Sequence, residues 1–217
     1  MSKVIVRSFQ ESDRSAVREI CCDTADRGGP IERTFPDRQW AADLLTSYYT
    51  DYEPSASVVA EIDGKVVGYV QASFDNRRYG LVIFWILGPR LIWKAFQRGL
   101  LFRAQLWRIV AVALRNWRRL FHWRKKSFHS HQGHMHIGIA KEARGLHIGR
   151  QLVEILIQHA KAKGVQELAA SVHSSNTAAC RFFEKSGFEV RDSYPMVMLR
   201  GETLEHYDAL LYVKTIA

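Results

Sequence analysis

The first stretch with chemical potential is a short loop that joins a strand-like segment to a helical pattern. Residues 142–153 read EARGLHIGRQLV and include Gly145 and Gly149. A loop of this kind gathers the unpaired N–H groups and the positive end of a helix at one point, which favours phosphate. Neither the G-x-x-x-x-G-K-[ST] motif nor a G-x-G-x-x-G motif with its later acidic residue is present. The loop therefore predicts an anion site, although glycine at a helix start also serves packing.

Histidines are the candidate proton acceptors, because imidazole titrates near neutral pH. His134 and His136 lie two residues apart in a predicted strand and should face the same side of it. Both are equally compatible with a structural, hydrogen-bonded role. His173, at the end of the next predicted strand, and Glu61, in an earlier one, are further candidates for a catalytic base.

Cysteine and histidine spacing favours neither a disulfide framework nor a metal site. Cys21 and Cys22 are adjacent, and the histidines before residue 137 lack a carboxylate or cysteine among them. The N-terminal segment has no signal-peptide pattern, and the apolar stretch Tyr79–Pro89 is too short to span a bilayer. We therefore expect a cytoplasmic protein without a bound metal.

Elements of alternating type should position these residues. We expect strands at 3–8, at 135–140 and at 167–173, a hairpin around Asp63-Gly64, closing strands near the C-terminus, and helices at 11–21, 38–50, 149–163 and 176–185. This rhythm predicts an α/β fold with a mixed sheet, formed by one domain over residues 1–217.

One basic and aromatic segment interrupts this rhythm and predicts a helical insertion at residues 78–132. The segment 77–141 contains 14 Lys and Arg without an acidic residue, and 81–126 holds five of the six tryptophans. Gly88-Pro89 and Gly99 should divide it into separate helices. Three interpretations remain open: packing on the sheet or on a second subunit of a homodimer, peripheral contact with an anionic membrane through 81–126, and nucleic-acid binding, the least favoured.

Two motifs together resemble those of a known family. Residues 144–149, RGLHIG, resemble the R/Q-x-x-G-x-G/A signature of the GNAT superfamily of acyl-CoA-dependent N-acyltransferases, and residues 176–188, NTAACRFFEKSGF, resemble its second motif. The hairpin VVAEIDGKVVGYV and the opening VIVRSFQESD are similar to the first strands of that family. The resemblance covers residues 3–75 and 133–216.

The resemblance implies a GNAT-type fold of six to seven strands with flanking helices, and with the inserted segment between the third and fourth strands. The fourth and fifth strands would splay apart around acetyl-CoA, the acyl donor. Its pyrophosphate and pantetheine would contact Ile137, Gly138, Ile139, Arg144, Gly145, Leu146, His147, Ile148, Gly149, Arg150, Asn176, Arg181 and Phe183. The implied activity is acetyl transfer to an amine of a small molecule or peptide.

Two positions depart from the family pattern. His147 replaces the middle glycine of the signature, so its side chain must point outward or the loop must open. Phe183 stands where many members carry a tyrosine that protonates the departing thiolate, and Cys180, Ser175 or water would have to substitute for it. A non-catalytic acyl-CoA-binding or membrane-associated module with the same fold is therefore the alternative.

Overall fold

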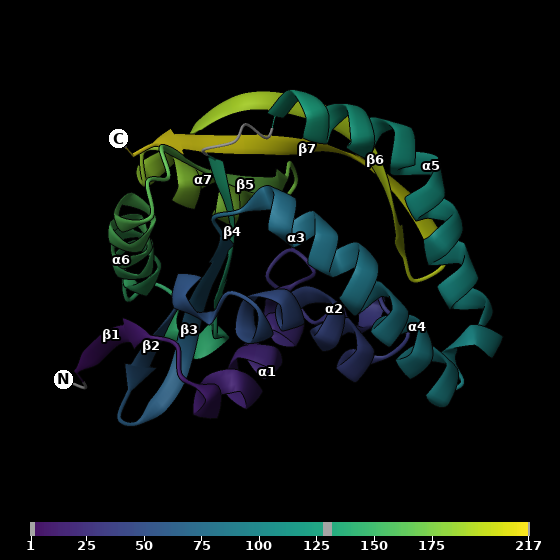
Figure 1. Ribbon diagram of the computed structural model, residues 1–217, viewed down its shortest axis with the longest axis horizontal. Helices are drawn as coiled ribbons and strands as arrows, with labels where there is room; N and C mark the ends of the chain where they lie inside the picture. The colour runs from purple at the N-terminus through teal and green to yellow at the C-terminus, as the bar shows by residue number, and fades with distance from the viewer. Residues whose placement is uncertain (1–2, 128–131, 217) are drawn as a thin grey trace.

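A seven-stranded mixed sheet runs through the molecule in the order β1-β2-β3-β4-β5-β7-β6 (Figure 1). The computed structural model describes residues 3–127 and 132–216, with the backbone alone for 118–127. The strands are β1 (Val4–Ser8), β2 (Ser57–Ile62), β3 (Lys65–Ser73), β4 (Gln132–Ile139), β5 (Glu167–His173), β6 (Glu189–Arg200) and β7 (Thr203–Thr215). The α/β class predicted from the sequence is confirmed.

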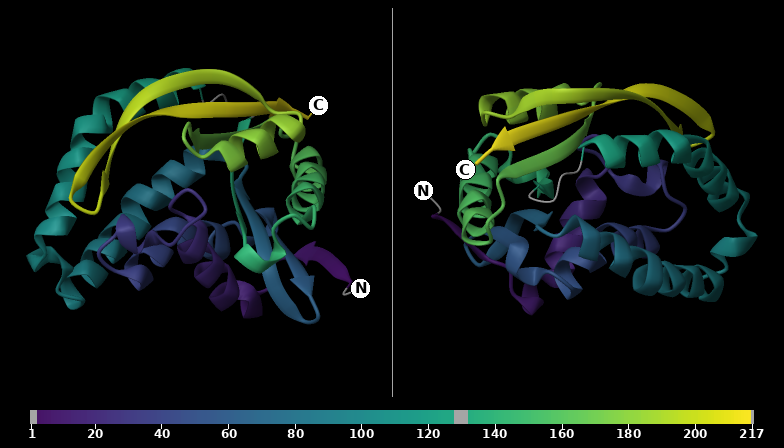
Figure 2. Two further views of the ribbon diagram at one scale, coloured as in Figure 1. Left: turned by 180° about the vertical axis from the view of Figure 1, so that it is seen from behind. Right: turned by 45° about the horizontal axis from the view of Figure 1, so that its top comes forward.

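Helices cover both faces of this sheet (Figure 2). They are α1 (Arg14–Thr24) and α2 (Arg38–Asp51) on one side, and α6 (Ile148–Ala162), followed in the chain by α7 (Thr177–Lys185), on the other. Alternation along β3 explains this arrangement: Tyr69 packs in the cluster of α1, whereas Val70 and Ala72 pack in the cluster of α6. The core thus consists of two apolar layers that share one sheet.

The hairpin turn between β2 and β3 has the backbone that its sequence predicts. Asp63 and Gly64 have φ angles of 49° and 78°, which are the two positive values that a two-residue turn of this type requires. This turn sets β2 antiparallel to β3 and so fixes which side chains of β3 face α1.

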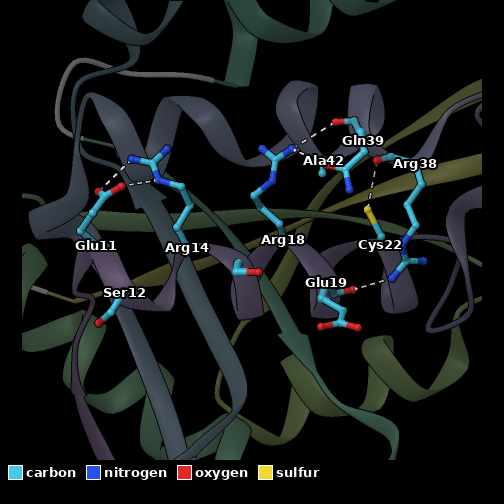
Figure 3. A pocket seen from close by; sticks show the side chains of 10 residues that line it. Glu11, Ser12, Arg14, Arg18, Glu19, Cys22, Arg38, Gln39 and Ala42 are labelled. Carbon is cyan, nitrogen blue, oxygen red and sulfur yellow. Dashed lines mark hydrogen bonds and ion pairs between the residues drawn. The ribbon is translucent and has the colours of Figure 1, made fainter. Parts of the chain in front are cut away.

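A polar groove separates α1 from α2, and its arginines are matched by acidic residues (Figure 3). Arg14 pairs with Glu11 at 2.6 Å, and Arg18 pairs with Asp43 at 2.5 Å. Arg38 pairs with two further carboxylates, at 2.7 and 2.8 Å. The pairs of Arg18 with Asp43 and of Arg38 with Asp23 join the two helices. None of the residues predicted to do chemistry lines this groove.

Three helices connect β3 to β4, which confirms the helical segment predicted between the third and fourth strands. They are α3 (Asn76–Val82), α4 (Gly88–Gln97) and α5 (Ala104–Ser127), with one π-helical turn at Ile83–Leu87. The predicted break at Gly88-Pro89 is wrong. The helix continues through Pro89 because the π-helical turn at Ile83–Leu87 directly precedes it, and such a local change of hydrogen bonding accommodates the missing N–H of proline.

The continuous helix Asn76–Gln97 is, by length and composition, able to cross a membrane. It has 22 residues, and 22% of its most apolar window is buried inside the protein. The sequence-based expectation of a segment too short to span a bilayer depended on the break at Gly88-Pro89, which does not occur.

Specific contacts hold the connecting helices against the rest of the chain. The indole Nε1 of Trp40 donates to the carbonyl of Leu91 at 2.9 Å, which ties α4 to α2. The buried Asn116 of α5 donates to the carbonyl of Val197 at 2.6 Å and accepts from its N–H at 3.3 Å. As a result α5 follows the β6–β7 hairpin along its length (Figure 1).

Candidate active site

The parallel strands β4 and β5 pair at only one end. Hydrogen-bonded register runs from Gln132 and Glu167 to His134 and Ala169 and then stops. Beyond this point β4 remains paired with β3, and β5 remains paired with β7. The edge of each strand that faces the gap therefore carries backbone N–H and C=O groups without a partner strand, where an extended ligand can bind.

A cavity of about 380 Å³ occupies this gap. Its walls come from both strands, from the segment around α1, from α7 and from the β6–β7 hairpin. They include Thr24, Asp26, Arg27, Tyr69, Met135, His136, Ile137, Ser171, His173, Asn176, Phe183, Met198 and Tyr207. Elements that are distant in sequence thus converge on the separated strands.

The predicted anion loop forms the N-terminus of α6. Helix α6 begins at Ile148, and its N-cap residue makes no side-chain cap, so the first N–H groups of the helix remain available. Gly145 has φ of 85°, a conformation that favours glycine, and a Cβ there would meet nothing within 4 Å. The loop therefore offers open backbone amides at the positive end of a helix.

His147 adopts a backbone conformation that favours glycine. Its φ and ψ are 57° and 15°, in the left-handed region, and its side chain is exposed. Histidine enters this region more readily than most residues, at an energetic cost. Of the two outcomes expected from the sequence, the outward-pointing side chain is the one that occurs.

Two other signature residues have packing contacts that the sequence did not reveal. The guanidinium of Arg144 donates to the carbonyl of Gly28 at 2.8 Å and to that of Ile139 at 3.3 Å. A Cβ on Gly149 would lie 2.8 Å from the ring of Phe182. Glycine at 149 thus allows α6 to approach α7, whereas the expectation from sequence placed a phosphate there.

The remaining residues of the predicted cofactor set lie on the same side of the sheet. Leu146 and Arg150 are exposed beside the loop, and Arg150 pairs with Glu154 at 2.9 Å. Arg181 is exposed on α7. Asn176 caps α7 by accepting from the N–H of Ala179 at 3.2 Å, and it lines the cavity.

The two histidines of β4 have different environments. Nδ1 of His134 lies 2.6 Å from Oδ1 of Asn76, and its Nε2 lies 3.1 Å from the hydroxyl of Tyr49. Both ring nitrogens of His134 are thus engaged. His136 lines the cavity, and its ring centroid lies 5.5 Å from that of Tyr49. Its ring is exposed toward the cavity, and partial desolvation by the surrounding protein lowers its pKa.

The hydrogen bonds of His173 determine its tautomer. The backbone N–H of Ser175 donates to Nδ1 at 3.2 Å, so neutral His173 carries its proton on Nε2. That Nε2 is buried and has no partner, and the ring stacks on Tyr207 at 3.8 Å. Burial, followed by the nearby charge of Arg27, lowers the pKa of His173. Nε2 of His173 is therefore a buried donor in the wall of the cavity, although the sequence suggested a base.

Glu61 does not join this group. Its carboxylate accepts from Arg7 at 2.9 Å, and Arg7 also pairs with Asp13 at 2.7 Å. The structure brings together His136 and His173 and leaves Glu61 in an ion-pair network between β1 and β2.

Phe183 is buried in the core, and its ring packs against other aromatic rings. Its ring lies 5.2 Å from Phe188 and 5.6 Å from Tyr212. The Tyr212 hydroxyl donates to Glu184 at 3.0 Å. Tyr207, on the opposite wall of the cavity, is a hydroxyl that sequence analysis missed, because a lone tyrosine in a strand carries no motif.

A buried ion cluster beside the cavity was also missed. Asp26 has a side chain only 1% exposed and accepts from Arg200 at 3.0 Å, while Arg27 pairs with Glu205 at 3.0 Å. These contacts join the loop after α1 to the β6–β7 hairpin. Among the described residues, the structure shows no group of three His, Cys, Asp or Glu side chains that is suited to a metal ion.

The separated strands, the helix N-terminus and the order of elements together match one family of proteins. The model of the acetyltransferase (GNAT) family matches residues 108–188. This part of the chain is a GNAT acetyltransferase domain by its match to the family model. The family match thus includes β4, β5 and α7, which line the cavity, and the anion loop with α6 between them.

Relatives of known sequence are acetyltransferases by name. An uncharacterized N-acetyltransferase of Methanocaldococcus jannaschii is 25% identical over 212 residues, which are 97% of this chain and 91% of that protein. A mycothiol acetyltransferase of Streptosporangium roseum is 36% identical over 76 residues. That match covers 31% of this GNAT chain and only 22% of the relative.

Solved structures share the complete fold. The structure of SsHAT superposes with a TM-score of 0.72, covers 99% of both chains and is 20% identical. The Salmonella typhimurium protein yncA, solved with its cofactor acetyl-CoA, has a TM-score of 0.61 at 17% identity, over 99% of this chain and 94% of that chain. At these identities the likeness concerns the fold alone, and it confirms the GNAT-type architecture predicted from the sequence.

Proposed function

We propose that this GNAT protein transfers an acetyl group from acetyl-CoA to an amine of a small molecule or peptide. The observation that supports it most is the gap between β4 and β5, which ends at the open amides before α6. The pantetheine arm would pair with the backbone at Ile137, Gly138 and Ile139. The pyrophosphate would bind the amides at Gly145 to Ile148, with Arg150 at their side.

The reaction requires a neutral amine, and His136 is the residue we propose to supply it. A lowered pKa keeps the imidazole of His136 neutral at pH 7, so the ring can accept a proton. The amine nitrogen then forms the new bond to the thioester carbon, and the carbon–sulfur bond breaks. Free N–H groups on β4 would stabilise the charge that develops on the carbonyl oxygen.

His173 would assist the departing thiolate without giving up its proton. A neutral imidazole N–H is a good hydrogen-bond donor but a very weak acid, so Nε2 of His173 can stabilise negative charge on sulfur by a hydrogen bond. A thiol pKa of about 8.5 makes the thiolate an acceptable leaving group, which water then protonates. This scheme needs no hydroxyl at Phe183.

Release of free thiol from acetyl-CoA in the presence of an amine panel tests the proposal, with calorimetric binding of acetyl-CoA as a second readout. We expect His136→Gln to lower the rate about 10²- to 10⁴-fold while acetyl-CoA binding is retained. His159→Gln, on α6, is the matched control and should leave both unchanged. Binding without turnover on any amine would instead support the acyl-CoA-binding module, for which the buried Phe183 is the favouring observation.

A further inference from the structure

The outward side of the helix Asn76–Gln97 carries a continuous set of large apolar side chains. We define this aromatic face by six residues, all at least half exposed: Leu81, Phe84, Trp85, Ile92, Trp93 and Phe96. The rings of Phe84 and Trp85 lie 4.8 Å apart, and those of Trp93 and Phe96 lie 5.6 Å apart. Exposed apolar side chains are ordinary when scattered, but a cluster of this kind marks a contact surface.

The opposite side of the same helix is fixed to the protein. Leu87, Leu91 and Ala95 are buried. Lys94 pairs with Asp43 of α2 at 2.6 Å, and Arg90 donates to Tyr52 at 2.6 Å. If this helix crossed a bilayer, it would carry these charged contacts and α2 with it into the apolar core, which is costly. The geometry therefore favours a helix that lies along a surface.

The positive charge of the surrounding segment favours one of the surfaces that the aromatic face could contact. The segment 77–141 contains 14 basic residues and no acidic residue. Arg77, Arg78 and Arg115 are exposed within it. A dimer formed through the aromatic face would place two such positive segments together, which is unfavourable. An anionic membrane surface is complementary to the same charges and accepts tryptophan and phenylalanine at its boundary.

We propose that the aromatic face docks this protein on anionic lipid bilayers, with the helix Asn76–Gln97 parallel to the membrane plane. The aromatic rings enter the boundary between headgroups and acyl chains. The basic side chains of the segment contact the anionic headgroups. This docking is independent of the proposed acetyl transfer, so each proposal can fail alone.

Sedimentation of the full chain with vesicles tests the docking. We expect binding to vesicles of phosphatidylcholine with about one third phosphatidylglycerol, weaker binding to pure phosphatidylcholine, and loss of binding at high salt, because surface charges are then screened. Replacement of Phe84, Trp85, Trp93 and Phe96 by Ser should weaken binding at least about 100-fold, since four large apolar side chains then no longer leave water.

Two controls separate docking from loss of structure. Ile5→Ser, Val190→Ser and Leu204→Ser remove exposed apolar groups on other elements and should leave binding unchanged. In the wild-type chain, brominated lipids should quench tryptophan fluorescence, and the double variant Trp85→Phe and Trp93→Phe should bind but show much less quenching.

Three results would overturn the proposal. The first is absence of binding to the anionic vesicles, and the second is equal binding to neutral and anionic vesicles. The third is a dimer of the wild-type chain in sedimentation analysis that does not form in the variant with four serines. This result would assign the aromatic face to a second copy of the chain.

Discussion

The left-handed backbone at His147 predicts that replacing this residue by glycine, at the start of α6, stabilises the protein. A non-glycine residue in this conformation costs about 1–2 kcal/mol. Glycine removes that cost, but its greater conformational entropy in the unfolded chain lowers stability by about 0.5–1 kcal/mol. His147→Gly should therefore raise the free energy of unfolding by about 0.5–1 kcal/mol, which corresponds to a melting temperature about 1–4 °C higher for a chain of this size.

The comparison with alanine isolates the backbone term. His147→Ala keeps a Cβ and removes only the imidazole, so its stability should stay near that of the parent and below that of His147→Gly. Gln158, exposed within α6, supplies the matched control. There Gln158→Gly should be less stable than Gln158→Ala by about 1 kcal/mol, as in any helix interior. The sign of the glycine-to-alanine difference should thus reverse between positions 147 and 158.

Urea unfolding followed by circular dichroism measures these differences, and calorimetry with coenzyme A measures the loop. Equal loss of coenzyme A affinity in both His147 variants would show that the imidazole contacts the pyrophosphate. If His147→Gly is no more stable than His147→Ala, the backbone at this position is not left-handed and the reasoning is refuted.

Three further predictions concern the cleft and its supports. The lowered pKa of His136 favours its neutral form in the folded state, so stability should be full above the ordinary pKa of 6.5 and should fall as the pH decreases through the lowered value. Urea midpoints at pH 7.5 and pH 5 check this, and His136→Phe should reduce the decrease. Asn116→Leu should lower the free energy of unfolding by about 2 kcal/mol, because the N–H and C=O of Val197 lose their buried partners; an unchanged urea midpoint would argue against that clamp. Gly149→Ala should lower the free energy of unfolding by about 1–3 kcal/mol, because the new Cβ contacts Phe182, and adding Phe182→Leu should recover part of that loss. Equal melting temperatures for the single and the double variant would contradict this explanation.

Local patterns were sufficient to predict most of the fold. The turn at Asp63-Gly64, the helices α2 and α6 and the cap at Asn176 each depend on a few neighbouring residues, which the sequence displays directly. The continuation of the helix through Gly88-Pro89 was not predictable in this way, because a proline within a helix usually ends it and the π-helical turn before Pro89 has no sequence signal.

The candidate site could be predicted only in part, since its motifs lie in the loop before α6 and in α7. The loop and the cap of α7 follow from residues close in sequence. By contrast, the tautomer of His173 depends on one backbone N–H, and the ion cluster of Asp26 and Arg200 joins residues far apart in the chain. Tyr207 reaches the cavity only because β7 pairs beside β5. Such convergence is a property of tertiary structure.

The pairing of Ser73 with His134 has a consequence for how the connecting helices relate to the sheet. These residues face each other in antiparallel register at the point where β3 ends. In topological terms, the chain between Ser73 and the start of β4 at Gln132 is therefore the loop of a β3–β4 hairpin, and a short turn would close the same pair. Shortening it to such a turn would save about 3 kcal/mol of closure entropy. The helices can thus be acquired, lengthened or lost without a change of register in the sheet. While they are present, the free energy of their own packing must offset that closure entropy.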